Sequence, residues 1–196
     1  MDKNVLEPLV RELKKLPGVG AKSAERMVYE MLNMTPEERE ILASNVLDLE
    51  KIKHCRTCNN LTLVDICEIC SDKNRDNVIL CVTDDVRNIN LFEANKLFPG
   101  KYFVLNKLIS PMLGVDPDDL NLSQLKDMVK QNKVEEIVIA LKPSIEGEAT
   151  ALYIAKIFDG QVKVSKMARG IPLGTEMEYL DSLTLSQALS DRKVIN

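Results

Sequence analysis

The sequence predicts a multi-module α+β protein that begins with a helical domain and continues into a parallel α/β sheet. Three observations predict this fold. Apolar residues repeat with helical spacing through the first 53 residues, four of the five cysteines fall within sixteen residues, and short apolar strands alternate with helical stretches over residues 78–165. We expect four modules with the bounds 1–53, 54–76, 77–165 and 166–196.

The composition fits a chain with an aliphatic core. Of the 196 residues, 45% are hydrophobic, 4% are aromatic and none is Trp. A net charge of −4 argues against a broadly basic surface, although residues 11–26 hold five cations against two acids. No apolar run approaches the roughly 20 residues of a membrane span, and the N-terminus lacks the features of a signal peptide. We therefore expect a cytoplasmic protein.

Three helices are expected in the first module. The first covers about residues 3–15 and ends at the LPGVG turn, and the second covers about 20–32. The third opens with TPEE, in which Thr35 and Glu38 form a capping box, and it extends to about residue 53. Three short helices this close together indicate a small helical domain.

The stretch LPGVGAKSAERM, residues 16–27, predicts contact with DNA phosphates. A tight turn with Gly18 and Gly20 leads into a helix N-terminus, where backbone N–H groups and the helix dipole suit a phosphate oxygen. Lys22 and Arg26 are four residues apart, so they share one helix face. The segment resembles the helix-hairpin-helix motif of DNA-binding proteins, which bind independently of sequence. The alternative is a helical hairpin that only packs against a partner.

The cysteine-rich segment predicts a structural zinc site. Its spacing is C-x2-C-x8-C-x2-C, and four thiolates complete a tetrahedral shell with no open position. The module has too little core to fold alone, so the metal should contribute folding energy. His54, the only histidine, is expected at the surface, and Cys81 is expected in a buried strand. The expected ligands are Cys55, Cys58, Cys67 and Cys70.

An alternation of strands and helices predicts a parallel sheet with right-handed crossovers. Sites in such sheets form where the strands end. A loop with Gly and a short helix near 184–190 should follow. The expected strands are 78–82, 102–105, 136–141 and 161–165, and the expected helices between them run to about 96, from the N-cap Ser123 to 132, and over 146–158.

Acidic residues follow the first and third of these strands. Asp84 and Asp85 come after one, and Glu146 and Glu148 come after the other. This arrangement resembles the Toprim domain of topoisomerases and primases. That family holds Mg²⁺ with an acid after the first strand and a D-x-D after a later one, often followed by E-G-E. Asp84 stands for the first acid, and Glu146-Gly147-Glu148 matches the later run.

The two D-x-D positions hold Lys142 and Ser144 instead of carboxylates. An ammonium group repels Mg²⁺ and offers it no lone pair, so catalytic metal chemistry is not expected. Simpler roles are open for the remaining acids. The pair after the first strand can cap a helix, and the pair after the third can face a helix dipole.

The order of the modules resembles the bacterial RecR family of recombination mediators. The resemblance covers essentially the whole chain. It is carried by LPGVGAKSAERM, the four-Cys spacing with the following SDKNRD, ISPMLGVDPDDL, EGEATALYIA and ARGIPLGTEMEYLDSLTLSQAL.

The resemblance implies a non-enzymatic DNA-repair protein that forms dimers, which pair into a tetrameric ring able to encircle DNA. With RecO and RecF it would load RecA onto gapped single-stranded DNA coated by single-strand-binding protein. It places Lys22 and Arg26 at the DNA, and one structural Zn²⁺ on the four cysteines. It places Asp84, Glu146 and Glu148 on an acidic surface for RecO or other partners, which a basic partner would suit.

The chain departs from the family pattern at four places. The family usually has Glu at Asp84, a neutral Asn or Asp at Lys142, G-G where this chain has Gly174-Thr175, and Gly-Arg near Asp191-Arg192. Two other classes of function stay open, namely a Toprim nuclease or primase and a zinc-containing adaptor that binds only protein.

Overall fold

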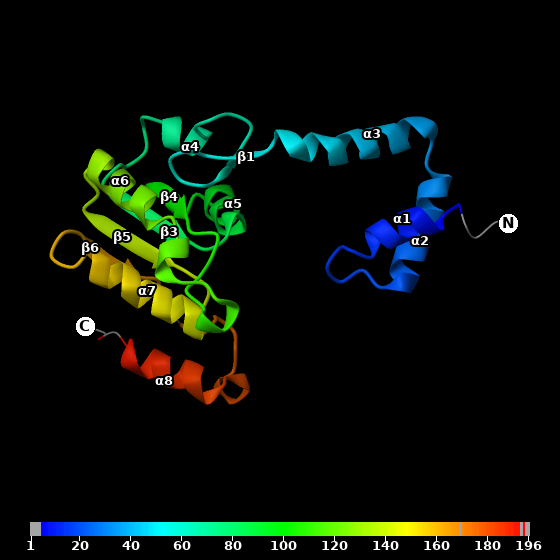
Figure 1. The fold of residues 1–196 in the computed structure, drawn as a ribbon. Coiled ribbons are helices and arrows are strands. Elements are labelled where there is room, and N and C mark those ends of the chain that lie inside the picture. Colours follow the sequence, from blue (N-terminus) through cyan, green and yellow to red (C-terminus); the bar gives the residue numbers. More distant parts are fainter. Residues whose placement is uncertain (1–4, 169, 193, 195–196) are drawn as a thin grey trace. The chain divides into compact units, whose positions relative to one another are not determined.

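The computed structural model describes residues 5–168, 170–192 and 194. The chain divides into two compact units, residues 1–52 and 53–196 (Figure 1). Within the described part of the chain, none of the helices has the length and apolar character needed to cross a bilayer. The finer division of the second unit into three modules stays a prediction.

The first unit consists of three helices. Its capping box is present as predicted: the Thr35 hydroxyl accepts the N–H of Glu38 at 3.2 Å, and the Glu38 carboxylate accepts the N–H of Thr35 at 2.8 Å. The third helix is shorter than predicted, because its last turn tightens into a 3₁₀ segment. Expected helical residues 3–4 lie outside the described residues. The elements are α1 (Glu7–Leu13), α2 (Ala21–Asn33), α3 (Pro36–Leu47) and η1 (Asp48–Lys51).

This unit has almost no core of its own. Among its described residues only Ala24 and Val28, both on α2, are buried. Helix α3 buries none of its residues, although it carries Ile41, Leu42, Val46 and Leu47. A module of this size needs more buried apolar area to be stable. Most of its aliphatic side chains are therefore exposed or only partly buried in the described chain.

The second unit begins with the cysteine module. Strands β1 (Lys53–His54) and β2 (Leu61–Thr62) pair antiparallel, and the short helix α4 (Glu68–Ser71) follows. The backbone carbonyl of Cys58 accepts the N–H of Val104 at 2.8 Å. The Asn59 amide donates to the carbonyl of Val104 at 3.0 Å. The cysteine module is thus hydrogen-bonded to a strand of the large sheet.

The large sheet is parallel, as predicted, with the order β4-β3-β5-β6 (Figure 1). Its last strand starts two residues later than predicted. Gln161 and Val162 instead donate their N–H groups to the carbonyl of Phe158, which prolongs the turn after α7. The strands are β3 (Ile79–Thr83), β4 (Lys101–Val104), β5 (Glu136–Ala140) and β6 (Lys163–Lys166).

Helices cover both faces of this sheet. Leu80 and Val82 of β3 share a buried cluster with residues of α6 and α7, whereas Cys81 packs with Ile89 of α5 on the other face. The predicted cap Ser123 is wrong: α6 begins one residue before it, with Asn121 at the N-cap and no side-chain cap. The helices are α5 (Val86–Ala94), α6 (Leu122–Asn132), α7 (Ile145–Ile157) and α8 (Ser182–Ser190), with 3₁₀ turns η2 (Pro111–Leu113), η3 (Pro117–Asp119) and η4 (Met177–Tyr179).

The strand order creates a topological switch point. The chain leaves β3 for β4 on one side and leaves β5 for β6 on the other side. The connections therefore diverge at the carboxyl ends of β3 and β5, which opens a crevice there.

Arg75 joins the segment after the cysteine module to the sheet. Its guanidinium donates to Glu93 of α5 at 2.8 Å and to the carbonyl of Gly100 at 3.1 Å. The Tyr102 hydroxyl donates to the same carboxylate at 2.6 Å. This partly buried network connects three segments that are distant in sequence.

Replacing Arg75 by Ala leaves the partly buried Glu93 carboxylate without its guanidinium partner. We expect the free energy of unfolding to fall by about 2 kcal/mol, measured by urea denaturation. The Arg75 guanidinium holds the pKa of Glu93 below its ordinary value. The difference in the free energy of unfolding between wild type and variant should thus have its full size at neutral pH. It should shrink as the pH falls below the ordinary pKa of Glu, about 4.3, and through the lower folded value.

The matched control is Arg87→Ala, because Arg87 pairs with Asp85 at an exposed position. An exposed pair contributes little, so this variant should keep the wild-type midpoint. Equal losses in the two variants would contradict the role of Arg75.

Candidate functional site

The four predicted cysteine ligands lie together. Their sulfur atoms are all within 4.8 Å of one another, and the Sγ atoms of Cys58 and Cys67 are 3.6 Å apart. Tetrahedral zinc with Zn–S bonds of about 2.3 Å requires S–S separations of about 3.8 Å. Three of the sulfurs belong to buried residues of the core that also holds β3 and β4. The donor set therefore fits a closed structural zinc site.

Hydrogen bonding within the cluster also favours a cation. Bonds from Cys58, and then from Cys70, lower the pKa of the Cys67 thiol to about 2. The bond to Cys67 raises the pKa of Cys58 instead. Deprotonation of one thiol is thus favoured, and deprotonation of further thiols is opposed unless a divalent ion compensates their charge. The N–H of Cys67 also donates to the sulfur of Cys55 at 3.3 Å.

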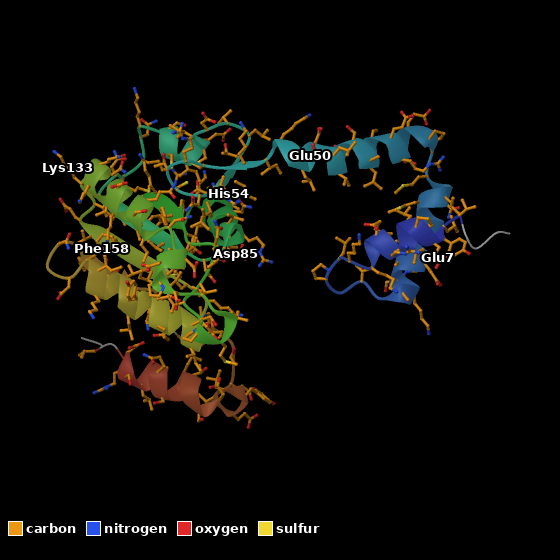
Figure 2. All side chains as sticks on the ribbon, viewed as in Figure 1. Glu7, Glu50, His54, Asp85, Lys133 and Phe158 are labelled. Atoms are coloured by element: carbon orange, nitrogen blue, oxygen red, sulfur yellow. The ribbon has the colours of Figure 1, made fainter. Side chains whose placement is uncertain are left out.

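The only histidine and the fifth cysteine of the chain lie outside the cluster. His54, labelled in Figure 2, is exposed as predicted. Its Nδ1 lies 3.0 Å from the carbonyl oxygen of Asn59. Cys81 is buried in β3 as predicted, and this burial raises the pKa of its thiol to about 12.

The N-terminus of α2 has the geometry expected of a phosphate contact. Gly18 lies in the left-handed region with φ of 78°, and Gly20 is an extended N-cap with no side-chain cap. The first turn of α2 carries no acidic residue. Lys22 and Arg26 are exposed, and neither forms an ion pair with any described residue. The first-turn N–H groups and two cations are thus available on one helix.

A cavity of about 510 Å³ occupies the crevice at the carboxyl ends of β3 and β5. Asp84 and Glu148 line it, whereas Glu146 does not. The structure therefore brings together two of the three carboxylates of the predicted partner surface, with the third on the first turn of α7. Other lining residues are Asn88, Leu91, Phe92, Lys142, Lys166 and Met167.

The carboxylates around this cavity have partners within the chain. The carboxylate of Asp84 accepts the backbone N–H of Lys142 at 3.3 Å, which joins the ends of β3 and β5. Glu148 pairs with Lys166 at 2.9 Å. The pKa of Glu146 is lowered, first by a hydrogen bond from its own backbone N–H, then by one from Ser144, and then by the charge of Lys142. Lysine side chains therefore offset part of the charge of Glu146 and Glu148, whereas Asp84 is held by a backbone donor.

Helix capping uses several of the predicted residues. Asp85, not Asp84, caps α5 by accepting the N–H of Arg87 at 2.8 Å (Figure 2), and the Arg87 side chain lowers its pKa. Ser144 caps α7 by accepting the N–H of Gly147 at 3.1 Å. A Cβ on Gly147 would lie 2.0 Å from the carbonyl oxygen of Lys142. The glycine of E-G-E thus permits a close backbone approach.

The sequence interpretation missed Lys166. It is the last residue of β6, next to β5 in the sheet, and it reaches Glu148 on α7. Its position at the carboxyl end of a predicted strand was the available signal.

The chain is similar to known proteins over its whole length. RecR models match over three ranges: the helix-hairpin-helix at residues 6–49, the four-cysteine zinc finger domain at 52–72 and the RecR C-terminal region at 170–193. A Toprim domain model matches residues 78–168. Recombination protein RecR of Legionella pneumophila strain Philadelphia 1 is 42% identical over 198 residues, covering 100% of both chains. That of strain Corby is 42% identical over 195 residues, covering 98% of this chain and 99% of its own.

Loss of the metal should loosen the sheet as well as the cysteine module. Cys58→Ser is expected to abolish the zinc content, measured by atomic emission. It should also speed hydrogen exchange at the N–H of Val104, which is bonded to the carbonyl of residue 58. Cys81→Ala, at a cysteine outside the cluster, should retain the zinc. Unchanged exchange at Val104 after zinc loss would show that the two parts are uncoupled.

The cavity should bind divalent ions weakly because ammonium groups border it. The variant Lys142→Asp removes one ammonium group and adds a carboxylate beside Asp84 and Glu148. The affinity of the cavity for Mn²⁺ should therefore rise at least about tenfold. The electron paramagnetic resonance signal of free Mn²⁺ measures this. Lys130→Asp makes the same charge change on the exposed face of α6. An equal gain in both variants would indicate only a general charge effect.

Proposed function

The chain belongs to the RecR family, and on this premise we propose that it is a non-enzymatic DNA-binding clamp for recombinational DNA repair. With RecO- and RecF-type partners it helps to load RecA onto gapped single-stranded DNA. A role at chromosomal DNA implies a cytoplasmic protein that associates with the nucleoid during repair.

The N-terminus of α2 is the observation that carries the DNA-binding part of this proposal. An uncapped helix start beside a glycine turn offers N–H groups to a phosphate. Lys22 and Arg26, exposed and without an ion pair in the described chain, can reach adjacent phosphates. Such contacts read no bases, so binding should be independent of sequence.

The exposed apolar residues of the first unit support self-association. With only Ala24 and Val28 buried among its described residues, this unit gains most from covering its aliphatic residues with a second copy. We propose dimers that pair into a tetrameric ring. Each subunit neutralises few phosphates, and a ring would let several weak contacts act together.

The cavity supports a binding role better than a catalytic one. Lys142 supplies no lone pair for Mg²⁺, and Ser144 is engaged in capping α7. We propose that Asp84 and Glu148, with Glu146 beside them, form part of the surface for a RecO-type partner. Because Lys166 pairs with Glu148, net charge alone should attract this partner only weakly.

A gapped duplex with a labelled strand tests the function directly. Protein and Mg²⁺ are added, and the mixture is run on native and denaturing gels. A shifted band with intact strands is expected. Cut strands would replace the clamp by a nuclease, and the absence of both binding and cutting would favour an adaptor that binds only protein.

The same assay tests the hairpin. Replacing both Lys22 and Arg26 by Ala should weaken binding at least about tenfold. The slope of log binding constant against log salt concentration should also become shallower by about 1.8 per bound subunit, as expected for two lost phosphate contacts.

Lys126 and Lys130 provide the matched control, since they are exposed and four residues apart on α6. Their double Ala variant should bind as wild type does. If the two double variants behave alike, the hairpin has no special role in DNA binding.

A further inference from the structure

The loop after β4 holds two large apolar side chains in solvent. Met112 is 94% exposed and Leu113 is 79% exposed. The loop belongs to the ISPMLGVDPDDL motif, which neither the zinc site nor the DNA contact explains. It runs beside the N-terminal half of α7 (Figure 1), where the Thr150 hydroxyl accepts the N–H of Ile109 at 2.9 Å.

Backbone hydrogen bonds fix the conformation of this loop. Ser110 and Val115 exchange two N–H···O bonds of 3.0 Å, which close its base. The N–H of Leu113 also donates to the carbonyl of Ser110 at 3.0 Å, and Gly114 takes the left-handed conformation that ends the turn. Ser110 is buried, so the base of the loop is anchored in the fold.

A fixed apolar protrusion is suited to binding. Two such side chains left in water forgo the favourable free energy of apolar burial. A loop that is already ordered also loses little conformational entropy when a partner covers it. Apolar anchors that fill a partner's pocket are the usual centres of affinity in protein interfaces.

The charges near the loop indicate the kind of partner. Asp116, Asp118 and Asp119 follow directly and are exposed, and Lys107 is the only cation between residues 106 and 121. The complementary surface is an apolar pocket rimmed by Lys or Arg.

The loop also lies at the edge of the sheet that bears the cavity. It starts at the carboxyl end of β4, and β4 pairs with β3, whose carboxyl end leads to Asp84. One partner surface can therefore reach both the loop and the cavity.

We propose that Met112 and Leu113 anchor a protein partner that has an apolar pocket with a basic rim. This inference rests on the proposed function, because we assign the anchor to the RecO-type partner of the same edge.

Isothermal titration calorimetry with purified RecO protein from the same genome tests the anchor. The variant Met112→Ser/Leu113→Ser should bind RecO at least about tenfold more weakly than wild type. It should keep its zinc content and its affinity for gapped DNA, which confirms that it is folded.

The matched control is Leu97→Ser, because Leu97 is also an exposed apolar residue, with 63% of its surface accessible. It precedes the amino end of β4, whereas the loop follows the carboxyl end. This variant should bind RecO as wild type does.

Three results would overturn the inference in distinguishable ways. If wild type itself does not bind RecO, the partner in the proposed function is wrong and the inference falls with it. If wild type and the double variant bind equally, only the inference is wrong. If the double variant changes its mass by light scattering, the loop contacts a second copy of this chain instead.

Discussion

The cysteine cluster is the constraint on which the second unit depends. Cys55, Cys58 and Cys67 are buried in the same core as the sheet and α6, so the metal site and the sheet share one set of packing contacts. The hydrogen bond between the carbonyl of Cys58 and the N–H of Val104 extends this connection to the backbone of β4. We therefore expect metal binding to order the edge of the sheet from which the loop at Met112 emerges as well.

The carboxyl edge of the sheet combines opposite charges with apolar surface. Asp84 joins the ends of β3 and β5 through the N–H of Lys142, and Lys166 partners Glu148. In a metal enzyme, these carboxylates would converge on an ion. Here a backbone N–H binds Asp84 and the ammonium group of Lys166 binds Glu148, and Met112 of the neighbouring loop is exposed. This edge thus presents carboxylates that already have partners in the chain, next to an exposed apolar loop.

The first unit differs from the second in how it reaches stability. Its helices are locally well specified, as the capping box at Thr35 shows, yet among its described residues only Ala24 and Val28 are buried. Local signals can start and end a helix, but they do not supply the apolar burial that stabilises a domain. If this unit associates with a second copy, DNA contacts at Lys22 would be multiplied by the same assembly that stabilises the helices.

Features that depend on near neighbours or on a simple period could be predicted from the sequence. The cysteine spacing predicted the cluster, TPEE predicted the start of α3, and the strand–helix alternation predicted a parallel sheet. The groups that meet at the edge of that sheet could not be predicted in this way. Lys166 and Glu148 are eighteen residues apart, and Lys142 meets Asp84 across fifty-eight, so the strand order and not the local pattern brings them together. The close approach at Gly147 likewise became visible only in the structure, because it depends on how the backbone turns from β5 into α7.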